Sequence, residues 1–299
     1  MKILNFGSLN IDYVYHVDHI IMPGETELAG DIRLFAGGKG LNQSVALARA
    51  GANVWHAGMI GEDGGVLREF LEENGVHTDY LKTDSEGRTG HTIIQVDRNG
   101  QNSIVLSGGT NRMITETIAD EVLSHFEQGD VLVLQNEISS IPYIIDRAAA
   151  MGMKIVMNPS PFDVHIADCD LGKVNLFLIN EVEGMQIAGV SDPDAILRSM
   201  AELYPKADVV LTLGASGSIF FGDGKIVRQP IFHVHAVDTT AAGDTYTGFF
   251  VSSFFAGHPV EECMKLASKA SAISVSRNGA APSIPSLMEV RETTLSCKR

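Results

Sequence analysis

Short apolar segments alternate with amphipathic segments through the middle of the chain, and this alternation constrains the fold more than any other feature. The predicted strands are 131–134, 154–157, 176–179 and 209–213, and predicted helices at 116–127, 141–151 and 192–203 interleave with them. The strands show no regular polar alternation, so both of their faces are expected to be buried. Strands that are joined through helices usually run parallel. We therefore expect an α/β fold with a doubly wound, mostly parallel sheet flanked by helices.

Two other stretches predict a small β-sheet outside that core. Residues 13–35 alternate loosely around Met22-Pro23-Gly24-Glu25, which is typical of a hairpin. Residues 92–96 and 103–106 flank Asp97-Arg98-Asn99-Gly100, a turn signal between two strands. The chain shows no linker and no internal repeat. We expect one domain over residues 1–299, with the strands of a small lid-like sheet drawn from about 10–36 and 89–108.

The composition excludes several classes of function. A net charge of −15 argues against binding to nucleic acid or to an anionic membrane, because either partner needs a basic face. No apolar run approaches the ~20 residues of a membrane span, and no signal peptide is visible, so we expect a cytoplasmic protein. Cys169, Cys263 and Cys297 are widely spaced and predict reduced thiols rather than disulfides or a zinc site.

The segment Asp238-Thr239-Thr240-Ala241-Ala242-Gly243-Asp244-Thr245 is the strongest candidate for a site. A buried helix is predicted to begin within it, at about residue 243. Small residues there let backbone N–H groups converge at the helix N-terminus, where the macrodipole favours an anion. Asp244 adds a carboxylate suited to deprotonating a hydroxyl beside a bound phosphoryl group. The alternative is an N-cap aspartate on an ordinary helix.

A second glycine-rich segment, Gly37-Gly38-Lys39-Gly40, opens another predicted helix. It is not a Walker A loop, because Lys39 is followed by Gly40, and no Gly-x-Gly-x-x-Gly follows the first strand. The glycines would let the backbone approach a small polar ligand, toward which Lys39 and Asn42 would point. The alternative is a tight turn with a solvated lysine. A ligand site requires this segment and residues 238–245 to meet in one crevice.

Polar side chains follow several predicted strands. Asn10 and Asp12 follow the first strand, where α/β sheets place ligand contacts. Glu137 follows the strand at 131–134 and is suited either to a sugar hydroxyl or to a solvated strand end. Asn180 and Glu183 lie one helical turn apart, and they fit either magnesium-bound water or an Asn cap with a surface Glu. Residues 212–217 open a glycine turn that is compatible with ribose or phosphate contacts, or with a turn alone.

The two glycine-bearing segments together resemble the paired signatures of the ribokinase-like (PfkB) carbohydrate kinases. The signatures are Gly37-Gly38-Lys39-Gly40-Leu41-Asn42-Gln43 and Asp238-Thr239-Thr240-Ala241-Ala242-Gly243-Asp244. Asn10-x-Asp12, Pro23-Gly24-Glu25, Asn158-Pro159-Ser160-Pro161, Asn180-x-x-Glu183 and Arg277-x-Gly279-Ala280-x-Pro282-Ser283 extend the resemblance from Asn10 to Pro285. It implies ATP-dependent phosphorylation of a sugar primary hydroxyl, and D-ribose is the sugar we expect.

The resemblance also implies a role for each matched residue. Asp244 would be the catalytic base, with Ala241, Ala242 and Gly243 as the anion hole for the γ-phosphoryl group. The sugar-binding residues, besides Asp244, would be Asn10, Asp12, Gly38, Lys39, Asn42 and Glu137. The nucleotide-binding residues would be Asn180, Thr212, Gly214, Gly217, Gly243 and Ser268.

Two metal ions and an assembly follow from the same resemblance. A monovalent-cation site, for potassium, would comprise Asp238, Thr240, Ser274, Arg277, Gly279 and Ser283. Glu183 would organise magnesium-bound water. The small sheet would serve as the sugar lid and as the contact of a homodimer.

Three departures from the family pattern bear on the sugar. Leu41 replaces the usual Ala, and His91 is expected near the sugar face of the lid where a small or apolar residue is usual. Residues 107–111 depart from the usual Gly-Ala-Asn-Ala. Because a buried unpaired hydroxyl costs ~1–3 kcal/mol, a bulkier and more polar lid would change which sugar hydroxyls are satisfied. The alternatives are a kinase for deoxyribose, a ketohexose or a nucleoside, and, in a different class, a non-catalytic sugar sensor.

Overall fold

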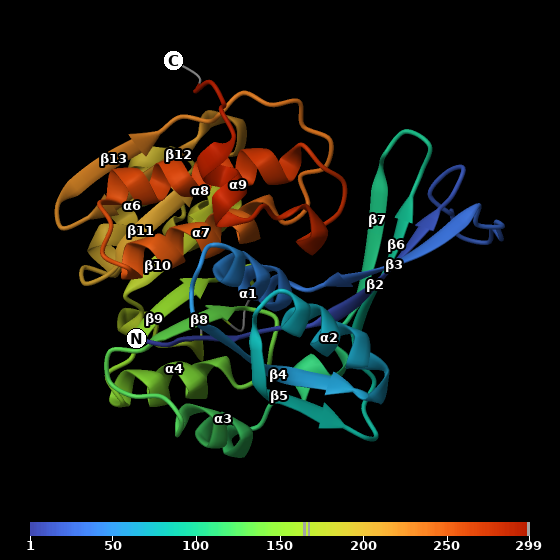
Figure 1. Ribbon diagram of the computed structural model, residues 1–299, viewed down its shortest axis with the longest axis horizontal. Coiled ribbons are helices and arrows are strands. Elements are labelled where there is room, and N and C mark those ends of the chain that lie inside the picture. Colours follow the sequence, from blue (N-terminus) through green and yellow to red (C-terminus); the bar gives the residue numbers. More distant parts are fainter. Residues whose placement is uncertain (164–165, 167, 298–299) are drawn as a thin grey trace.

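The computed structural model describes residues 1–163, 166 and 168–297, in which a large sheet runs through the core (Figure 1). Its strand order is β13-β12-β11-β10-β9-β8-β1-β4-β5. The parallel strands are β1 (Ile3–Phe6), β4 (Val54–Gly61), β5 (His77–Asp84), β8 (Val131–Gln135), β9 (Lys154–Asn158), β10 (Leu176–Asn180) and β11 (Asp208–Thr212). The antiparallel strands β12 (Ser218–Gly222) and β13 (Lys225–Gln229) complete one edge. The predicted doubly wound, mostly parallel sheet is confirmed.

Helices cover both faces of this sheet. One apolar cluster lies under α1 (Lys39–Arg49), α2 (Gly65–Glu73), α7 (Ala242–Phe255), α8 (Val260–Val275) and α9 (Leu287–Glu292). A second cluster lies under α3 (Glu116–Leu123), α4 (Ile141–Ala150), α5 (Glu181–Ala188) and α6 (Pro193–Leu203). Ile3 belongs to the first cluster and Leu4 to the second, as expected for a strand whose successive side chains enter opposite layers. Within the described part of the chain, no helix combines the length and the apolar character that a bilayer span requires.

A small sheet projects from one end of the core (Figure 1). Its strand order is β3 (Asp31–Gly37), β2 (Asn10–His16), β6 (Gly90–Val96) and β7 (Asn102–Ser107). The central pair β2 and β6 is parallel, whereas the two outer pairs are antiparallel. These strands come from the two stretches that the sequence predicts, and β3 ends one residue beyond the expected limit of about 36.

The prediction differs from the structure at several elements. β5 and α5 are absent from the prediction, and the helix expected at 116–127 ends at Leu123. β5 is an edge strand in which only Thr78 and Leu81 are buried, so it lacks the apolar run of the central strands. α5 has only eight residues, too few for a clear helical period.

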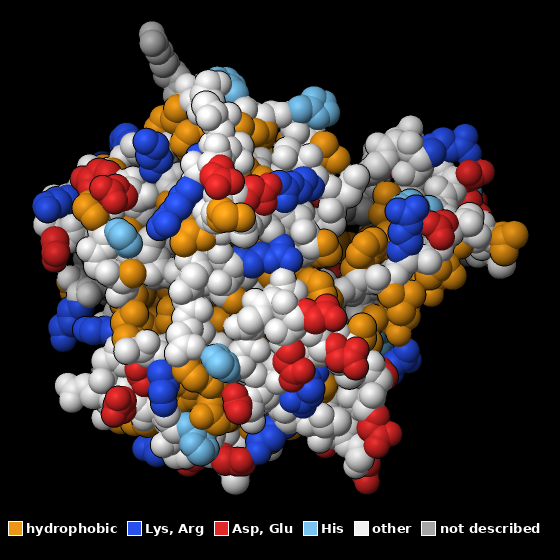
Figure 2. Space-filling view, viewed as in Figure 1, with side chains coloured by type: hydrophobic (Ala, Val, Ile, Leu, Met, Phe, Trp, Pro, Cys, Tyr) orange, Lys and Arg blue, Asp and Glu red, His pale blue; other side chains and the backbone are white. Residues whose placement is uncertain are grey.

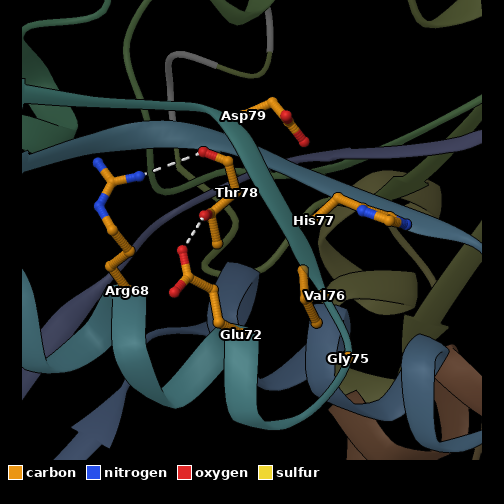
Figure 3. Close-up of a pocket in the computed structure, with 7 residues that line it drawn as sticks. All are labelled: Arg68, Glu72, Gly75, Val76, His77, Thr78 and Asp79. Atoms are coloured by element: carbon orange, nitrogen blue, oxygen red, sulfur yellow. Dashed lines mark hydrogen bonds between the residues drawn. The ribbon is translucent and has the colours of Figure 1, made fainter.

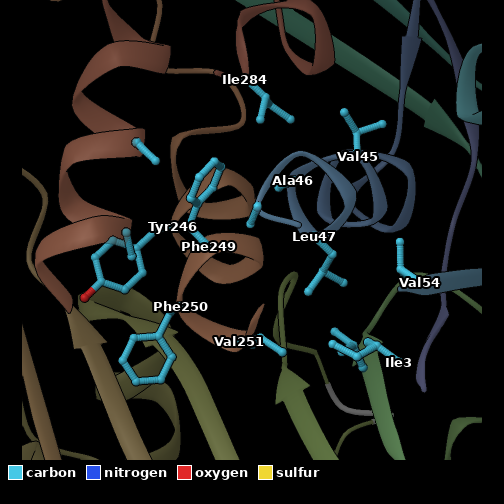
Figure 4. Packing of buried hydrophobic residues seen from close by; sticks show 14 of the residues in the cluster. Ile3, Val45, Ala46, Leu47, Val54, Tyr246, Phe249, Phe250, Val251 and Ile284 are labelled. Carbon is cyan, nitrogen blue, oxygen red and sulfur yellow. The ribbon is translucent and has the colours of Figure 1, made fainter. Parts of the chain in front are cut away.

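Close packing of α1 against α7 sets the geometry of the site (Figure 4). A Cβ atom on Gly248 would lie 2.3 Å from the Cβ atom of Ala46, so only glycine allows this approach. Ala46 and Leu47 of α1 and Phe249 and Val251 of α7 belong to the same buried cluster. The N-terminal turns of both helices therefore lie side by side.

Candidate active site

The N-terminus of α7 carries the carboxylate that the sequence predicts as the base. Asp244 lies in the first turn and is buried, with 6% of its surface exposed. Its Oδ2 accepts a hydrogen bond from Asn42 Nδ2 at 3.0 Å, and its Oδ1 accepts one from Gln43 Nε2 at 2.9 Å. The first of these bonds joins residues 202 positions apart, so the two glycine-bearing segments meet as predicted. The N-cap is Ala241, so the alternative that Asp244 caps the helix is wrong.

The backbone at the start of α7 presents amide groups beside this carboxylate. Ala241 is left-handed, with φ of 58°, and this turns the chain into the helix. The Ala242 N–H donates to Thr239 O at 3.2 Å and is thereby partly occupied. The N–H groups of Gly243 and Asp244 belong to the first turn, where amides have no intrahelical partner. Of the expected anion hole, Gly243 therefore keeps an N–H available to a ligand, and the Asp244 N–H, which was not part of that expectation, lies next to it.

Lys39 and Glu137 form the opposite wall of the site. Glu137 Oε2 accepts from the Lys39 backbone N–H at 3.1 Å and from the Ser8 hydroxyl. Burial raises the pKa of Glu137, although Lys39 and Ser8 oppose that shift. Burial acts to lower the pKa of Lys39, but the charges of Asp244, Glu137 and Glu183 outweigh it and raise the pKa. Lys39 is partly buried and interacts with the charges of three carboxylates, so the alternative of a solvated lysine is wrong.

The small sheet supplies the remaining predicted sugar residues. Asn10 Oδ1 accepts from Asn111 Nδ2 at 2.9 Å, and Asp12 Oδ1 accepts from the Thr92 hydroxyl at 2.5 Å. A Cβ atom on Gly37 would lie 2.0 Å from Asp12 Oδ2, so glycine there makes room for the carboxylate. Burial raises the pKa of Asp12 to about 6, with Glu137 adding to the shift and Thr92 opposing it. Gly38, with φ of +93°, packs against the backbone of residues 8–10 and joins β3 to α1.

The expectation that His91 lies on the sugar face of the small sheet is wrong. His91 pairs with Ile11, one position before the Asp12–Thr92 pair, so the pleat directs the two side chains to opposite faces. The His91 ring contacts Tyr13 edge to face at 6.3 Å, on the side of the sheet away from Asp12. Thr92, and not His91, is the residue that changes the surroundings of Asp12.

A cavity of about 470 Å³ lies beside the N-terminus of α7. Of the predicted nucleotide residues, it is lined by Thr212, Gly214, Gly217, Gly243 and Ser268. Asn180 does not line it, but Asn180 pairs with Thr212 at the ends of neighbouring strands. The Asn180 and Glu183 side chains form a capping box at the start of α5. The alternative is therefore right about the Asn180 cap, but it is wrong about a surface Glu, since Glu183 is only 4% exposed.

The residues predicted for a monovalent cation fall into two linked groups. Asp238 accepts hydrogen bonds from the Thr240 hydroxyl at 2.6 Å and from the Gly279 N–H at 2.9 Å. Ser274 Oγ lies 2.7 Å from Ser283 Oγ. Arg277 is ion-paired with Glu289 instead, so its side chain does not join either group. Within residues 1–163, 166 and 168–297, there is no group of three or more His, Cys, Asp or Glu side chains placed so that together they could bind a metal ion.

A separate, wider pocket of about 560 Å³ lies between α2 and β5 (Figure 3). Its Arg68 donates to the Thr78 carbonyl, and its Glu72 accepts from the Thr78 hydroxyl at 2.5 Å. Arg68 and Glu72 are thus bonded to the neighbouring strand. None of the predicted site residues lines it, so the cavity at α7 remains the candidate site.

Sequence reasoning missed the residues that hold the site in place. Gln43 bridges Asp244 and Gln135, whose Nε2 donates to Gln43 Oε1 at 2.7 Å. Ser8 bonds Glu137, and Asn111 holds the start of β2 through Leu9 and Asn10. The alternation of side chains along β2 and β6 could have placed Thr92 on the face of Asp12, but only if the register between the two strands had been known.

Comparison with known proteins agrees with this arrangement. The family model described as pfkB family carbohydrate kinase matches residues 1–287. The chain belongs to this family. It is 34% identical over 294 residues to the ribokinase of Haemophilus influenzae, a match that covers 96% of each chain.

Solved structures of ribokinases share the fold. The ribokinase of Cryptococcus neoformans in complex with ADP is 31% identical, with a TM-score of 0.85 over 97% of this chain and 99% of that one. The Arabidopsis thaliana ribokinase complexed with ribose and ATP is 28% identical, with a TM-score of 0.85 over 97% of both chains. A ribokinase-like kinase fold is therefore established for this chain.

Proposed function

We propose that this carbohydrate kinase transfers the γ-phosphoryl group of ATP to the primary hydroxyl of D-ribose, giving ribose 5-phosphate and ADP. The observation that carries the proposal is the position of Asp244. It is buried, its carboxylate is oriented by Asn42 and Gln43, and it lies in the first helical turn beside a nucleotide-sized cavity. A sugar sensor without catalysis would not need a base beside free amides.

The reaction needs little covalent chemistry from the protein. Asp244 accepts the proton of the primary hydroxyl as its oxygen attacks the γ-phosphorus, and the bond from that phosphorus to the β,γ-bridging oxygen breaks. The Gly243 and Asp244 amides stabilise the charge on the transferred group, with Ala241 and Ala242 shaping the turn. Lys39, a cation near Asp244, adds to that stabilisation.

The sugar is held from two sides. Asn42, Gly38 and Lys39 approach it from the start of α1, and Glu137 from the end of β8. Asn10 and Asp12 approach it from the small sheet. We propose that this sheet acts as a lid, because closing it over the sugar would exclude water and limit ATP hydrolysis.

ATP would occupy the cavity lined by Thr212, Gly214, Gly217 and Ser268, with Asn180 at its edge. The donor set also fits two metal ions. Glu183, a buried carboxylate close enough to act on the charge of Lys39, would hold magnesium-bound water. Magnesium, when bound, neutralises charge on the phosphates.

A potassium ion would fit the oxygen-rich loops around Asp238, Thr240, Ser274, Gly279 and Ser283. Hydroxyl, carboxylate and backbone oxygens are the ligands such an ion prefers, and Arg277 would contribute only its backbone, since Glu289 holds its side chain.

We also propose a cytoplasmic enzyme, because ATP is its phosphoryl donor, and a homodimer that forms through the small sheet.

A sugar panel tests the proposed function. The purified protein is assayed for ADP release with ribose, 2-deoxyribose, fructose and adenosine, each with MgATP and with or without potassium. We expect ribose to be phosphorylated and potassium to raise the rate. Turnover of only a ketohexose or a nucleoside would reject the ribose assignment, and sugar binding without turnover would favour a sensor.

A further inference from the structure

One row of side chains crosses the sugar face of the small sheet at Asp12. Cross-strand pairing places Phe35, Asp12, Thr92 and Leu106 in register over β3, β2, β6 and β7. Laterally paired residues of a sheet share a face, so these four side chains lie on one side. Thr92 is 8% exposed, and its hydroxyl donates to Asp12 Oδ1 at 2.5 Å. The Asp12 carboxylate is therefore hydrogen-bonded before any sugar arrives.

The two oxygens of Asp12 are in different situations. Thr92 is the side chain that donates to Oδ1, and over the described ranges of the chain no donor to Oδ2 is found. Oδ2 itself occupies the space that a side chain on residue 37 would fill, and Gly37 makes room for it. A carboxylate can accept from two adjacent hydroxyls, one to each oxygen. Here one of the two oxygens already accepts a hydrogen bond from the protein.

The neighbours in the row offer a sugar hydroxyl no substitute for that position. Phe35 and Leu106, which flank the Asp12–Thr92 pair, have no hydrogen-bonding side chain. A sugar hydroxyl that does not donate a hydrogen bond to Asp12 therefore finds no other partner in this row. A sugar that lacks this hydroxyl loses little binding free energy.

We propose that Thr92 is a specificity-determining residue whose hydroxyl takes the place of one sugar hydroxyl on Asp12. The enzyme then accepts a pentose that lacks one hydroxyl of an adjacent pair, 2-deoxyribose, as well as ribose. The inference rests on the proposed sugar kinase activity and on the binding of the sugar by Asp12.

The hydroxyl of Thr92 is removed in Thr92→Val, which keeps the shape, and retained in Thr92→Ser. In Thr92→Val, ribose can fill the vacated acceptor with its own hydroxyl, whereas 2-deoxyribose leaves a half-buried carboxylate oxygen without a donor. We expect kcat/KM for 2-deoxyribose to fall about tenfold more than kcat/KM for ribose, mainly through KM. Thr92→Ser should keep the wild-type ratio of the two sugars.

The outcomes separate this inference from the proposed function. Equal losses for both sugars in Thr92→Val, or a wild-type enzyme that phosphorylates ribose but not 2-deoxyribose, would overturn the role of Thr92 alone. Failure of the wild-type enzyme with both sugars would overturn the proposed function. Circular dichroism checks that each variant is folded. If Thr92→Val does not fold, the ratio of kcat/KM for 2-deoxyribose to kcat/KM for ribose is measured with Thr92→Ala, which also lacks the hydroxyl, and is interpreted in the same way.

Discussion

At the scale of single residues, the site works because each functional group is held by a specific neighbour. Asn42 and Gln43 each donate to one oxygen of Asp244, and each oxygen keeps a further lone pair that can accept a proton or a hydrogen bond. Gln43 is in turn fixed by Gln135, which donates to it and to Asn5. Such a chain of buried hydrogen bonds fixes the position of the base before the substrate binds.

The raised pKa of Asp12 predicts a pH dependence of sugar binding. With a pKa of about 6, caused mainly by burial and increased by Glu137, Asp12 gains a proton as the pH falls through 6. The protonated group is a weaker acceptor, so we expect KM for the sugar to rise about tenfold from pH 8 to pH 5 at saturating ATP. Steady-state kinetics on the wild-type enzyme and on Asp12→Asn measure this pH dependence of KM. The same rise in Asp12→Asn, where residue 12 cannot ionise, would assign the dependence to another group.

Gly243 predicts a separation of activity from stability. Its φ is not left-handed, and an added Cβ atom would meet nothing within 4 Å, although the residue lines the nucleotide cavity. Gly243→Ala should therefore keep or raise stability, by up to ~1 kcal/mol, because alanine favours the helix. Its methyl group would occupy the space of the phosphoryl group, and we expect kcat/KM for ATP to fall at least about tenfold.

The matched control for Gly243→Ala is Gly65→Ala, at the start of α2, where an added Cβ atom also meets nothing. It should gain similar stability and keep full activity. Thermal melts measure the stability of both variants, and ADP-release kinetics measure their activity. A normal kcat/KM for ATP in Gly243→Ala would show that residue 243 is not part of the phosphate site.

Many residues of the candidate site can be predicted from the sequence, whereas the residues that hold them in position cannot. Asp244, Lys39 and Asn42 lie in glycine-rich segments with a recognisable chemical pattern. Thr92 and Asn111 carry no such pattern, because their importance comes from strand pairing and from long-range contacts. The expected face of His91 is wrong for the same reason, since a shift of one residue reverses the face of a strand.

At the scale of elements, the crossing of α1 and α7 brings the two signature segments together. Gly248 lets the helices approach, and Leu47 and Phe249 fill the contact around it (Figure 4). The strands and helices of the core follow from apolar patterning, so most of them could be predicted. The contact between α1 and α7 could not, because nothing local to either helix specifies its partner.

Gly248→Ala should lower stability and activity together. Its Cβ atom would meet Ala46 Cβ at 2.3 Å and the backbone of Leu47 at 2.7 Å, so the helices must separate. Overpacking of this kind costs about 1–3 kcal/mol, and Asn42 would move away from Asp244. Chemical denaturation and kinetics measure both effects. The added change Ala46→Gly should restore part of the stability, and an unchanged free energy of unfolding in Gly248→Ala would contradict the close packing.

At the scale of the whole molecule, apolar side chains are exposed over the small sheet (Figure 2). By strand register, several of them lie on the face opposite Asp12. Leu34, Tyr13, Ile93 and Val105 form one row across its four strands. Leu34 is 61% exposed and Val105 is 64% exposed. Ile93 is exposed as well, whereas Tyr13 is partly buried. Exposed apolar side chains grouped in this way are typical of an interaction surface, which supports the proposed homodimer.

Val105→Glu tests that assembly. A charge at the β7 end of the row would be buried without a partner in a dimer, so we expect the dimer to dissociate at least about tenfold more readily. Analytical ultracentrifugation measures the change. Ile226→Glu is the matched control, because Ile226 is 56% exposed on β13, outside the small sheet. A wild-type protein that sediments as a monomer would contradict the proposed dimer directly.

The account depends most on Asp244 as the base that receives the hydroxyl proton. Asp244→Asn keeps the size of the side chain and removes its charge, so the fold and ribose binding should persist. We predict that kcat for ribose, measured by ADP release at saturating MgATP, falls by ~10²–10⁴ while the melting temperature stays near that of wild type. A folded Asp244→Asn enzyme with near-normal kcat would contradict the proposed mechanism.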